Sequence, residues 1–348
     1  MQFIKLAALA ATIAGVAAHP ERHDHSNTNS IHHPHKIHTR SDKCARNIEQ
    51  RRDAAFMKRR HALGKRATTE ANRFMYKEIQ NKTCLLAPDT IFGPYNVDGE
   101  LHRHDVREEQ EGVNLYLDLG VIDVETCEPL PDAWLTIWAC NATGTYSGYT
   151  GINPNTVSLL DGWTARDDGT TDDETFLRGI SKTNEAGIAE FLTIFPGYYD
   201  SRTTHIHVTV QSHVNNTDTS YSDAAIQHVG QLFFTEELIN SVYQLSPYAS
   251  HLSTLNRTLN SEDSVYSVAN ADGNSAIIST QLLGETLAEG LIGYITIGVN
   301  KSASAIATTG QDVNVQGYLP TVSLSSSAQA AANTKDLAEG YKANGLRV

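Results

Sequence analysis

The sequence has no long hydrophobic run beyond its first residues, and it has few positive charges. No later stretch of the 348-residue chain approaches the roughly 20 apolar residues that a membrane-spanning helix needs. The 27 Lys and Arg residues face 40 Asp and Glu residues, which gives a formal net charge of −13. This acidic balance argues against nucleic acid or an anionic membrane surface as a partner. Aromatic residues make up only 7% of the chain and form no clear row, which disfavours a polymer-binding surface.

Cysteine is also scarce, with single residues at positions 44, 84, 127 and 140. An even number is typical of disulfides formed in an oxidising compartment. Residues 133–140 read as one strand, which would carry Cys140 about 25 Å from the turn that holds Cys127. A bridge between these two is therefore disfavoured. Two arrangements stay open, in which Cys127 pairs either with Cys44 or with Cys84.

The amino-terminal part predicts export. Residues 1–18 combine a lone Lys5 with an apolar run and end in Val-Ala-Ala, the pattern of a secretory signal peptide. Residues 19–43 are rich in histidine, and we expect a disordered leader, with weak metal scavenging as the alternative. Residues 44–82 are charged and permit a helix. The basic pairs at 59–60 and 65–66 fit either propeptide processing or a solvated helix face.

Other features agree with a secreted, extracellular protein. The carboxyl-terminal end is polar and carries no lipid-anchor signal. Five sites fit the acceptor pattern for N-linked glycans, which is typical of surface loops in exported proteins. They are Asn81, Asn141, Asn215, Asn256 and Asn300.

From residue 84 onward the sequence changes to short alternating stretches separated by turns rich in Gly, Asp, Asn and Pro. We expect strands near 113–119, 135–140, 188–194, 206–210, 231–234, 275–279 and 291–297. One helix is expected at 235–243. Many short strands without regular helices between them predict an all-β protein, with a β-sandwich core over 83–300. The segment 301–348 is rich in Ser and Ala and is predicted to be a poorly ordered tail.

The strongest chemical signal is a His-x-His pair in the strand near 206–210. His205 and His207 point to the same face of a strand, about 6.5–7 Å apart, and two imidazoles so placed can bind one metal ion. Tyr199 lies just upstream, where a turn could bring its phenolate to the same ion. Tyr146 follows a buried-looking strand and is a second tyrosine candidate. Phenolate is a hard anionic ligand that favours Fe(III) over Zn(II) or Cu(I).

Together these residues resemble the intradiol ring-cleavage dioxygenases, most closely their secreted fungal branch. The resemblance covers roughly residues 84–240 and follows the order of the family's motifs. It implies a non-haem Fe(III) held by four side chains: Tyr146, Tyr199, His205 and His207. The tyrosine ligand is the fourth position counted from Pro196, which selects Tyr199 over Tyr198. By the family pattern Tyr199 and His205 would be axial ligands, and the other two would be equatorial.

The resemblance also assigns residues around the substrate. Arg202 matches the arginine over the bound substrate, Gln231 matches a glutamine that would hold Arg202, and Tyr199 doubles as the base. The segment Gly93-Pro94-Tyr95 resembles the family's pocket-lining Gly-Pro-aromatic element, and Tyr149 is expected to line the same pocket. The implied reaction cleaves a catechol-type ring between its two hydroxyls with O2 and gives a muconate-type diacid. The expected partners are a small aromatic diol and O2, with a homodimer left open and neither nucleic acid nor a membrane involved.

Two other hypotheses compete with this assignment. The first is a secreted β-sandwich module that binds a polymer without catalysis. The second is a copper or zinc enzyme that uses His205 and His207 and leaves the tyrosines unexplained. A further His-x-His pair, His102 and His104, follows a glycine and precedes a charged run, and we interpret it as surface.

Overall fold

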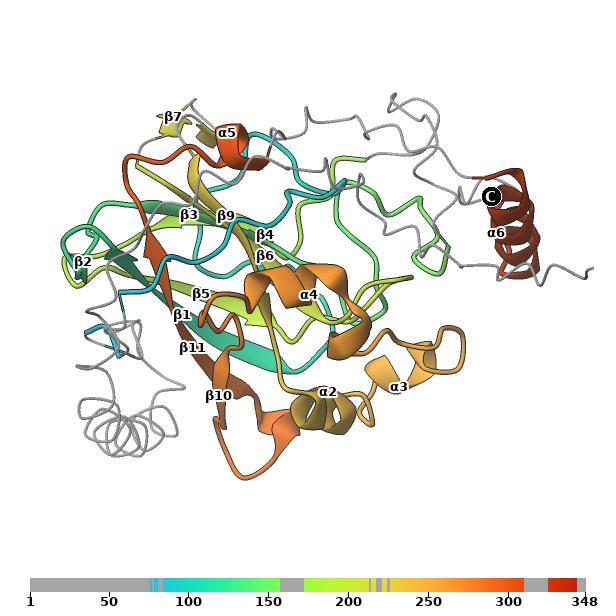
Figure 1. Cartoon of the computed structure of the whole chain (residues 1–348). Coiled ribbons are helices and arrows are strands. Elements are labelled where there is room, and N and C mark those ends of the chain that lie inside the picture. Colours follow the sequence, from blue (N-terminus) through green and yellow to red (C-terminus); the bar gives the residue numbers. More distant parts are fainter. Residues whose placement is uncertain are drawn as a thin grey trace, which may run out of the picture.

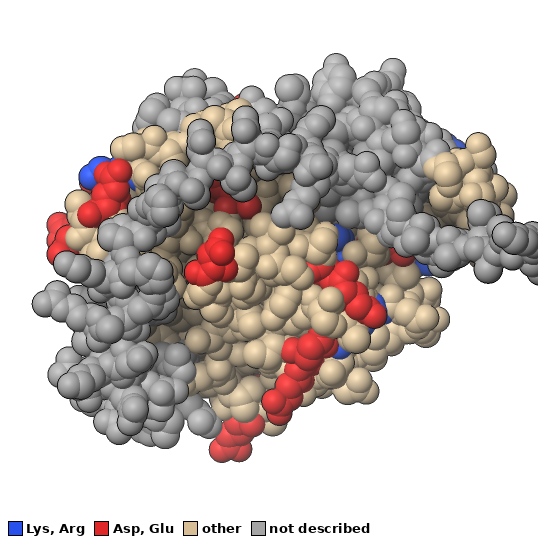
Figure 2. Space-filling model, viewed as in Figure 1, with Lys and Arg blue, Asp and Glu red and all other residues tan. Residues whose placement is uncertain are grey.

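The computed structural model describes residues 76, 78–80, 84–156, 172–212, 214–216, 221–223, 226–309 and 325–342 (Figure 1). The predicted signal peptide at 1–18, the leader at 19–43 and nearly all of the 44–82 segment lie outside the described residues. Within the described ranges, no helix has the length and apolar character needed to cross a bilayer. On the face shown in Figure 2, acidic side chains are more prominent than basic ones, as the negative net charge implies.

Two sheets form the body of the protein, and they lie against one another in Figure 1. The first sheet has the order β10-β11-β1-β2, and β5 also pairs with β1; β1 and β11 run parallel. Its strands are β1 (Asn114–Asp123), β2 (Glu128–Pro129), β5 (Ile188–Ile194), β10 (Ser279–Leu282) and β11 (Leu291–Val299). The second sheet is antiparallel, with the order β4-β3-β6-β9. Its strands are β3 (Trp134–Trp138), β4 (Arg178–Lys182), β6 (His205–Gln211) and β9 (Ile226–Phe233).

The largest hydrophobic cluster lies between these sheets. Alternate residues of β1 and of β6 enter it, as the period of two in a strand requires. From β6 these are Ile206, Val208 and Val210. His205 and His207 therefore point to the other face of the second sheet, where both side chains are buried. The all-β sandwich is confirmed.

Helices and a small hairpin complete the described structure. The hairpin joins β7 (Val214–Asn216) to β8 (Tyr221–Asp223). The helices are α2 (Glu236–Val242), α3 (Tyr248–His251), η3 (Asn260–Glu262), α4 (Ser264–Ala269), η4 (Leu287–Glu289), α5 (Ala305–Thr309) and α6 (Ser326–Ala338). The predicted helix at 235–243 is confirmed as α2, and the Thr235 hydroxyl caps it by accepting from the Leu238 amide.

Two expectations differ from the structure. The strand expected at 275–279 is β10, which begins only at Ser279, because Ile277 before it makes one isolated bridge to Phe233 rather than a ladder. The segment expected to be poorly ordered contains α5 and α6. Asp336 of α6 is buried and accepts hydrogen bonds from Asn153 and Thr156. These polar contacts across about half the chain cannot be read from a Ser- and Ala-rich composition.

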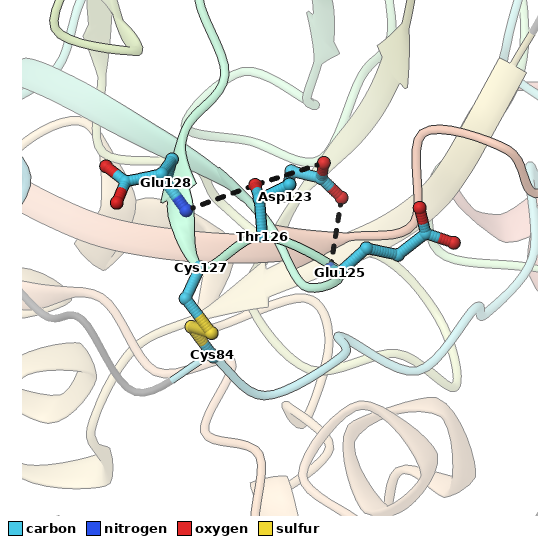
Figure 3. Close-up of a disulfide and its surroundings, with 6 residues drawn as sticks. All are labelled: Cys84, Asp123, Glu125, Thr126, Cys127 and Glu128. Carbon is cyan, nitrogen blue, oxygen red and sulfur yellow. Dashed lines mark hydrogen bonds between the residues drawn. A yellow bond between two sulfur atoms is a disulfide. The ribbon is translucent and has the colours of Figure 1, made fainter.

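A disulfide joins Cys84 to Cys127 in the turn after β1 (Figure 3). This is one of the two pairings of Cys127 that the sequence left open, and no 127–140 bridge forms, as expected. Closing 43 residues of chain stabilises the fold by about 4 kcal/mol, through the entropy removed from the unfolded state. Cys140 is buried and free, and Cys44 lies outside the described residues.

Candidate metal centre

The two histidines of β6 lie at the centre of the second sheet. In the ladder His207 is opposite Trp138 of β3 on one side and opposite Gln231 of β9 on the other. The indole of Trp138 stacks on the imidazole of His207, with ring centroids 4.6 Å apart and planes 9° from parallel. The Nε2 atoms of His205 and His207 are 3.1 Å apart. The strand thus aims both ring nitrogens at one point, as the His-x-His spacing predicts.

The protonation of His205 suits a metal ligand. Its Nδ1 lies 2.6 Å from the carbonyl oxygen of Thr203, which can only accept, so Nδ1 carries the proton. Nε2 is then left with its lone pair directed toward His207. Burial, with Arg202 as a nearby positive charge, lowers the pKa of His205 to about 3. The ring is therefore neutral at physiological pH, which is the form that coordinates metals.

Two turns bring the tyrosines to the same place. Tyr146 sits in the turn after β3, and Tyr199 in the segment after β5. The backbone carbonyl of Asn141 accepts from the amides of both Gly144 and Gly197, so one oxygen ties the turns together. The rings of Tyr146 and Tyr199 meet edge to face at 5.6 Å.

Each tyrosine also lies against a histidine. Tyr199 is 5.7 Å from His205 and Tyr146 is 6.4 Å from His207, measured between ring centroids. The structure therefore brings together all four residues that the sequence assigned as ligands. They come from β6 and from two turns that are joined by backbone hydrogen bonds.

The phenol groups fit a hard cation. Burial raises the pKa of both Tyr146 and Tyr199 well above 10, so both are neutral phenols unless a cation offsets the charge. The hydroxyl of Tyr146 is buried beside that of Tyr199 and makes no hydrogen bond of good geometry within the described residues. Such an atom costs about 1–3 kcal/mol, and a bound metal ion would relieve that cost. Within the described ranges, no group of three or more His, Cys, Asp and Glu side chains could hold a metal ion; the candidate set here combines two histidines with two tyrosines.

Arg202 and Gln231 meet beside this cluster. Arg202 is 1% exposed, and its Nη2 donates to Oε1 of Gln231, as the sequence analysis expected. Its Nη1 lies 3.5 Å from the hydroxyl of Tyr199. Its Nε donates to Oδ2 of Asp263 at 2.8 Å, and both side chains of this ion pair are 1% exposed. Sequence reasoning missed Asp263, because it lies 61 positions beyond Arg202 and outside the motifs that carry the family resemblance.

The predicted pocket residues adjoin the four candidate ligands. Tyr95 stacks on Tyr146 at 4.5 Å, and its ring edge meets Tyr149 at 5.3 Å. The turn that carries Tyr95 begins at Gly93 and Pro94, and the Gly93 carbonyl accepts from the side chain of Asn96. The structure thus places Tyr95 and Tyr149 in one tyrosine cluster with the candidate ligands.

Other candidates are turned away from this site. The hydroxyl of Tyr198 donates to the carbonyl of Leu255, within the main core cluster rather than the tyrosine cluster. His102 is exposed and meets Trp134 edge to face, while Nδ1 of His104 contacts the Glu190 carbonyl. The surface interpretation of His102 agrees with its exposure; His104 is partly buried.

A buried ion pair supports the turn that carries Tyr146. Arg178 of β4 donates to the carbonyl and the hydroxyl of Ser147, and its Nη1 lies 3.6 Å from Oε1 of Glu100. Burial raises the pKa of Glu100 to about 7, because lost hydration outweighs the attraction of Arg178 and Arg103. The carboxyl is therefore half protonated near neutral pH.

This raised pKa predicts a stability that falls as pH rises. Between pH 4.5 and about 7 the unfolded chain releases the Glu100 proton while the folded protein retains it. The free energy of unfolding should then fall by about 1.4 kcal/mol per pH unit, or about 3 kcal/mol in total. We expect the advantage of the wild type over Glu100→Gln to shrink by that amount from pH 4.5 to 8 in urea unfolding. A difference that does not change with pH would contradict the shift.

Comparisons with known proteins identify the family of this chain. No family model and no curated protein matches it. Among solved structures, an intradiol ring-cleavage dioxygenase from Tetranychus urticae has 30% sequence identity and a TM-score of 0.51, covering 64% of this chain and 97% of that one. A second solved dioxygenase has 28% identity and a TM-score of 0.50, with the same coverage. Catechol 1,2-dioxygenase from an Acinetobacter species has 18% identity and a TM-score of 0.40, covering 68% of both chains. At this identity and coverage, with the fold described above, the chain belongs to the intradiol ring-cleavage dioxygenase family.

Proposed function

We propose that this protein is an extracellular non-haem Fe(III) dioxygenase that cleaves catechol-type rings between the two hydroxyls and yields muconate-type diacids. The observation that carries the proposal is the convergence of two tyrosine rings and two histidine rings, with the histidine Nε2 atoms 3.1 Å apart, in one buried cluster. Two phenolates offset two of the three charges of Fe(III), and two neutral imidazoles add none. Two phenolates are hard anionic ligands that suit a trivalent ion better than the softer or divalent ions of copper and zinc, so these two metals are disfavoured.

The residues around the cluster have distinct roles in this proposal. Iron held by these four side chains would be chelated by the two oxygens of the diol and would make the ring reactive toward O2. Tyr199 would hold the iron as a phenolate, and its oxygen could accept a proton from the diol, because burial raises the pKa of the free phenol and so favours its protonated form. Arg202 is permanently charged and lies 3.5 Å from the Tyr199 hydroxyl, so it would stabilise negative charge that develops on the substrate. Gln231 would hold the Arg202 guanidinium in position by accepting its hydrogen bond.

The alternative of a polymer-binding module finds less support. Such a module needs exposed aromatic side chains, and the large exposed hydrophobic residues of the described ranges are all leucines: Leu86, Leu259 and Leu337. Secretion, glycosylation and membership of the fungal branch stay predictions from the sequence.

Oxygen uptake with a panel of diols tests the proposal. The panel contains catechol, a hydroxylated and a chlorinated catechol, and protocatechuate, and product spectra separate cleavage between the hydroxyls from cleavage beside them. We expect a protein with one iron per chain, a visible tyrosinate-to-iron absorption band, and a muconate-type product. A colourless protein that takes up no iron on reconstitution would contradict the proposal. Export is tested separately, by sequencing the amino terminus of the protein secreted by its native source.

A further inference from the structure

Asp263 uses both of its carboxylate oxygens in the buried region behind Arg202. Oδ2 accepts from Nε of Arg202 at 2.8 Å and from the backbone amide of Thr203 at 3.0 Å. Oδ1 accepts from the amides of Val265 and Tyr266 at 2.8 and 3.1 Å, and so caps α4. One carboxylate therefore links the first turn of α4 to the residues that precede β6.

The neighbours of Asp263 fix its position. α4 packs through Val265 and Ala269 against Phe233, which pairs with His205 in the ladder of β6 and β9. Asn260, three residues earlier, accepts a hydrogen bond from the hydroxyl of Thr203 at 2.7 Å. The segment 260–263 thus holds Thr203 through both its amide and its hydroxyl, while Arg202 lies directly beside it. Because α4 and β9 are both part of the core, Asp263 has little freedom to follow a displaced guanidinium.

We propose that Asp263 is the positioning residue for Arg202, holding the guanidinium so that Nη1 faces Tyr199 and the substrate; this rests on the proposed function. Each nitrogen of the Arg202 guanidinium faces a different residue. Nε donates to Asp263 and Nη2 to Gln231, and Nη1 lies 3.5 Å from the hydroxyl of Tyr199. The negative charge also compensates a guanidinium that is 1% exposed and would otherwise be a costly buried cation.

Asp263→Asn separates this role from helix capping. Asparagine caps helices as well as aspartate does, so its one amide oxygen can still accept from Val265 and Tyr266. Its NH2 group would then face two other donors, Nε of Arg202 and the amide of Thr203. The guanidinium is expected to move away, while the helix remains. The matched control is Asp272→Asn, the same change at an exposed aspartate a few residues beyond α4.

Arginine side-chain NMR on the iron-free full-length protein tests the positioning without reference to activity. The Nε–H signal of Arg202 is identified by its loss in Arg202→Gln. We expect this proton to exchange slowly with solvent in the wild type and in Asp272→Asn, and at least about 10-fold faster in Asp263→Asn, because its acceptor is gone. Asp263→Ser, which keeps a capping hydroxyl, replaces Asp263→Asn if that variant does not fold. Rapid exchange in the wild type, or unchanged exchange in the folded variant, would overturn the proposal.

Kinetics of the iron-loaded protein add a second readout. We expect Asp263→Asn to lower kcat/KM for the diol by about 10- to 100-fold, while iron content and the visible band keep their wild-type values. In an Arg202→Gln background the same change is expected to cost less than about 3-fold, because the two residues act as one unit. If the double variant instead loses the product of the two single-variant factors in kcat/KM, Asp263 acts independently of Arg202, which would contradict the proposal. A wild type that holds iron but cleaves no diol would sink the proposed function, and the NMR result would still decide the role of Asp263.

Discussion

Replacing Tyr199 by phenylalanine is expected to abolish ring cleavage, with a fall in kcat/KM of about 1000-fold or more. Phenylalanine keeps the edge-to-face contacts with Tyr95 and Tyr146, so the fold should survive. It removes the phenolic oxygen that would serve both as a metal ligand and as the base that accepts a proton from the diol. Oxygen uptake measures the activity, and the visible spectrum reports the loss of one tyrosinate.

The adjacent residue supplies the matched control. Tyr198→Phe makes the same chemical change one position earlier, but that hydroxyl donates to the Leu255 carbonyl in the main core. We expect this variant to keep its visible band and a kcat/KM within about 3-fold of wild type, with about 1 kcal/mol less stability from the lost hydrogen bond. Comparing the two variants therefore tests whether Tyr199, the fourth residue counted from Pro196, is the metal ligand rather than Tyr198.

Tyr146→Phe completes the test of the ligand set. Its hydroxyl makes no hydrogen bond of good geometry within the described residues, so its removal should not destabilise the iron-free protein. We expect the free energy of unfolding without iron to stay the same or to rise, while iron retention and activity fall. Activity that survives in both Tyr146→Phe and Tyr199→Phe would contradict the proposed centre.

The local patterns of the sequence were enough to place most strands and the His-x-His pair of the candidate site. Alternation in 188–194 and 291–297 corresponds to β5 and β11, because each of these strands packs one face against the same core. His205 and His207 share a face because the strand period is two. Tyr146 and Tyr199 were located by family motifs, and their approach depends on contacts between two turns that no local pattern reveals.

The parts that could not be predicted depend on contacts between distant segments. Asp263 looks like an ordinary helix cap in the sequence, and only the packing of α4 on β9 brings it to Arg202. The order of α6 depends on Asp336 meeting Asn153 and Thr156, about 180 positions away. In both cases a buried polar side chain has its partner outside any sequence window, so composition and periodicity carry no signal for it.

Gly144 is the position where the metal centre depends most on backbone geometry. A Cβ at this residue would lie 2.3 Å from the carbonyl oxygen of Tyr198 and 3.1 Å from Cβ of Pro154. Its φ of +87° is also unfavourable for other residues. The turn carrying Tyr146 thus touches the backbone just before Tyr199, and any side chain at 144 must push the two turns apart. We expect Gly144→Ala to lower the free energy of unfolding by about 3 kcal/mol or more.

Gly148 separates crowding from backbone strain. Its φ of +79° is nearly the same, yet the nearest atom to an added Cβ is the Glu174 carbonyl oxygen at 3.9 Å. Gly148→Ala should therefore cost only about 1 kcal/mol, the penalty for a left-handed alanine. Urea unfolding of the iron-free proteins gives both values, and metal analysis shows whether iron is held. Because the extra cost at Gly144 comes from displacing one tyrosine turn from the other, we expect Gly144→Ala alone to lose iron. If both variants lose the same free energy of unfolding and both retain iron, the contact between the two turns is not what holds the candidate ligands in place, which would contradict this prediction.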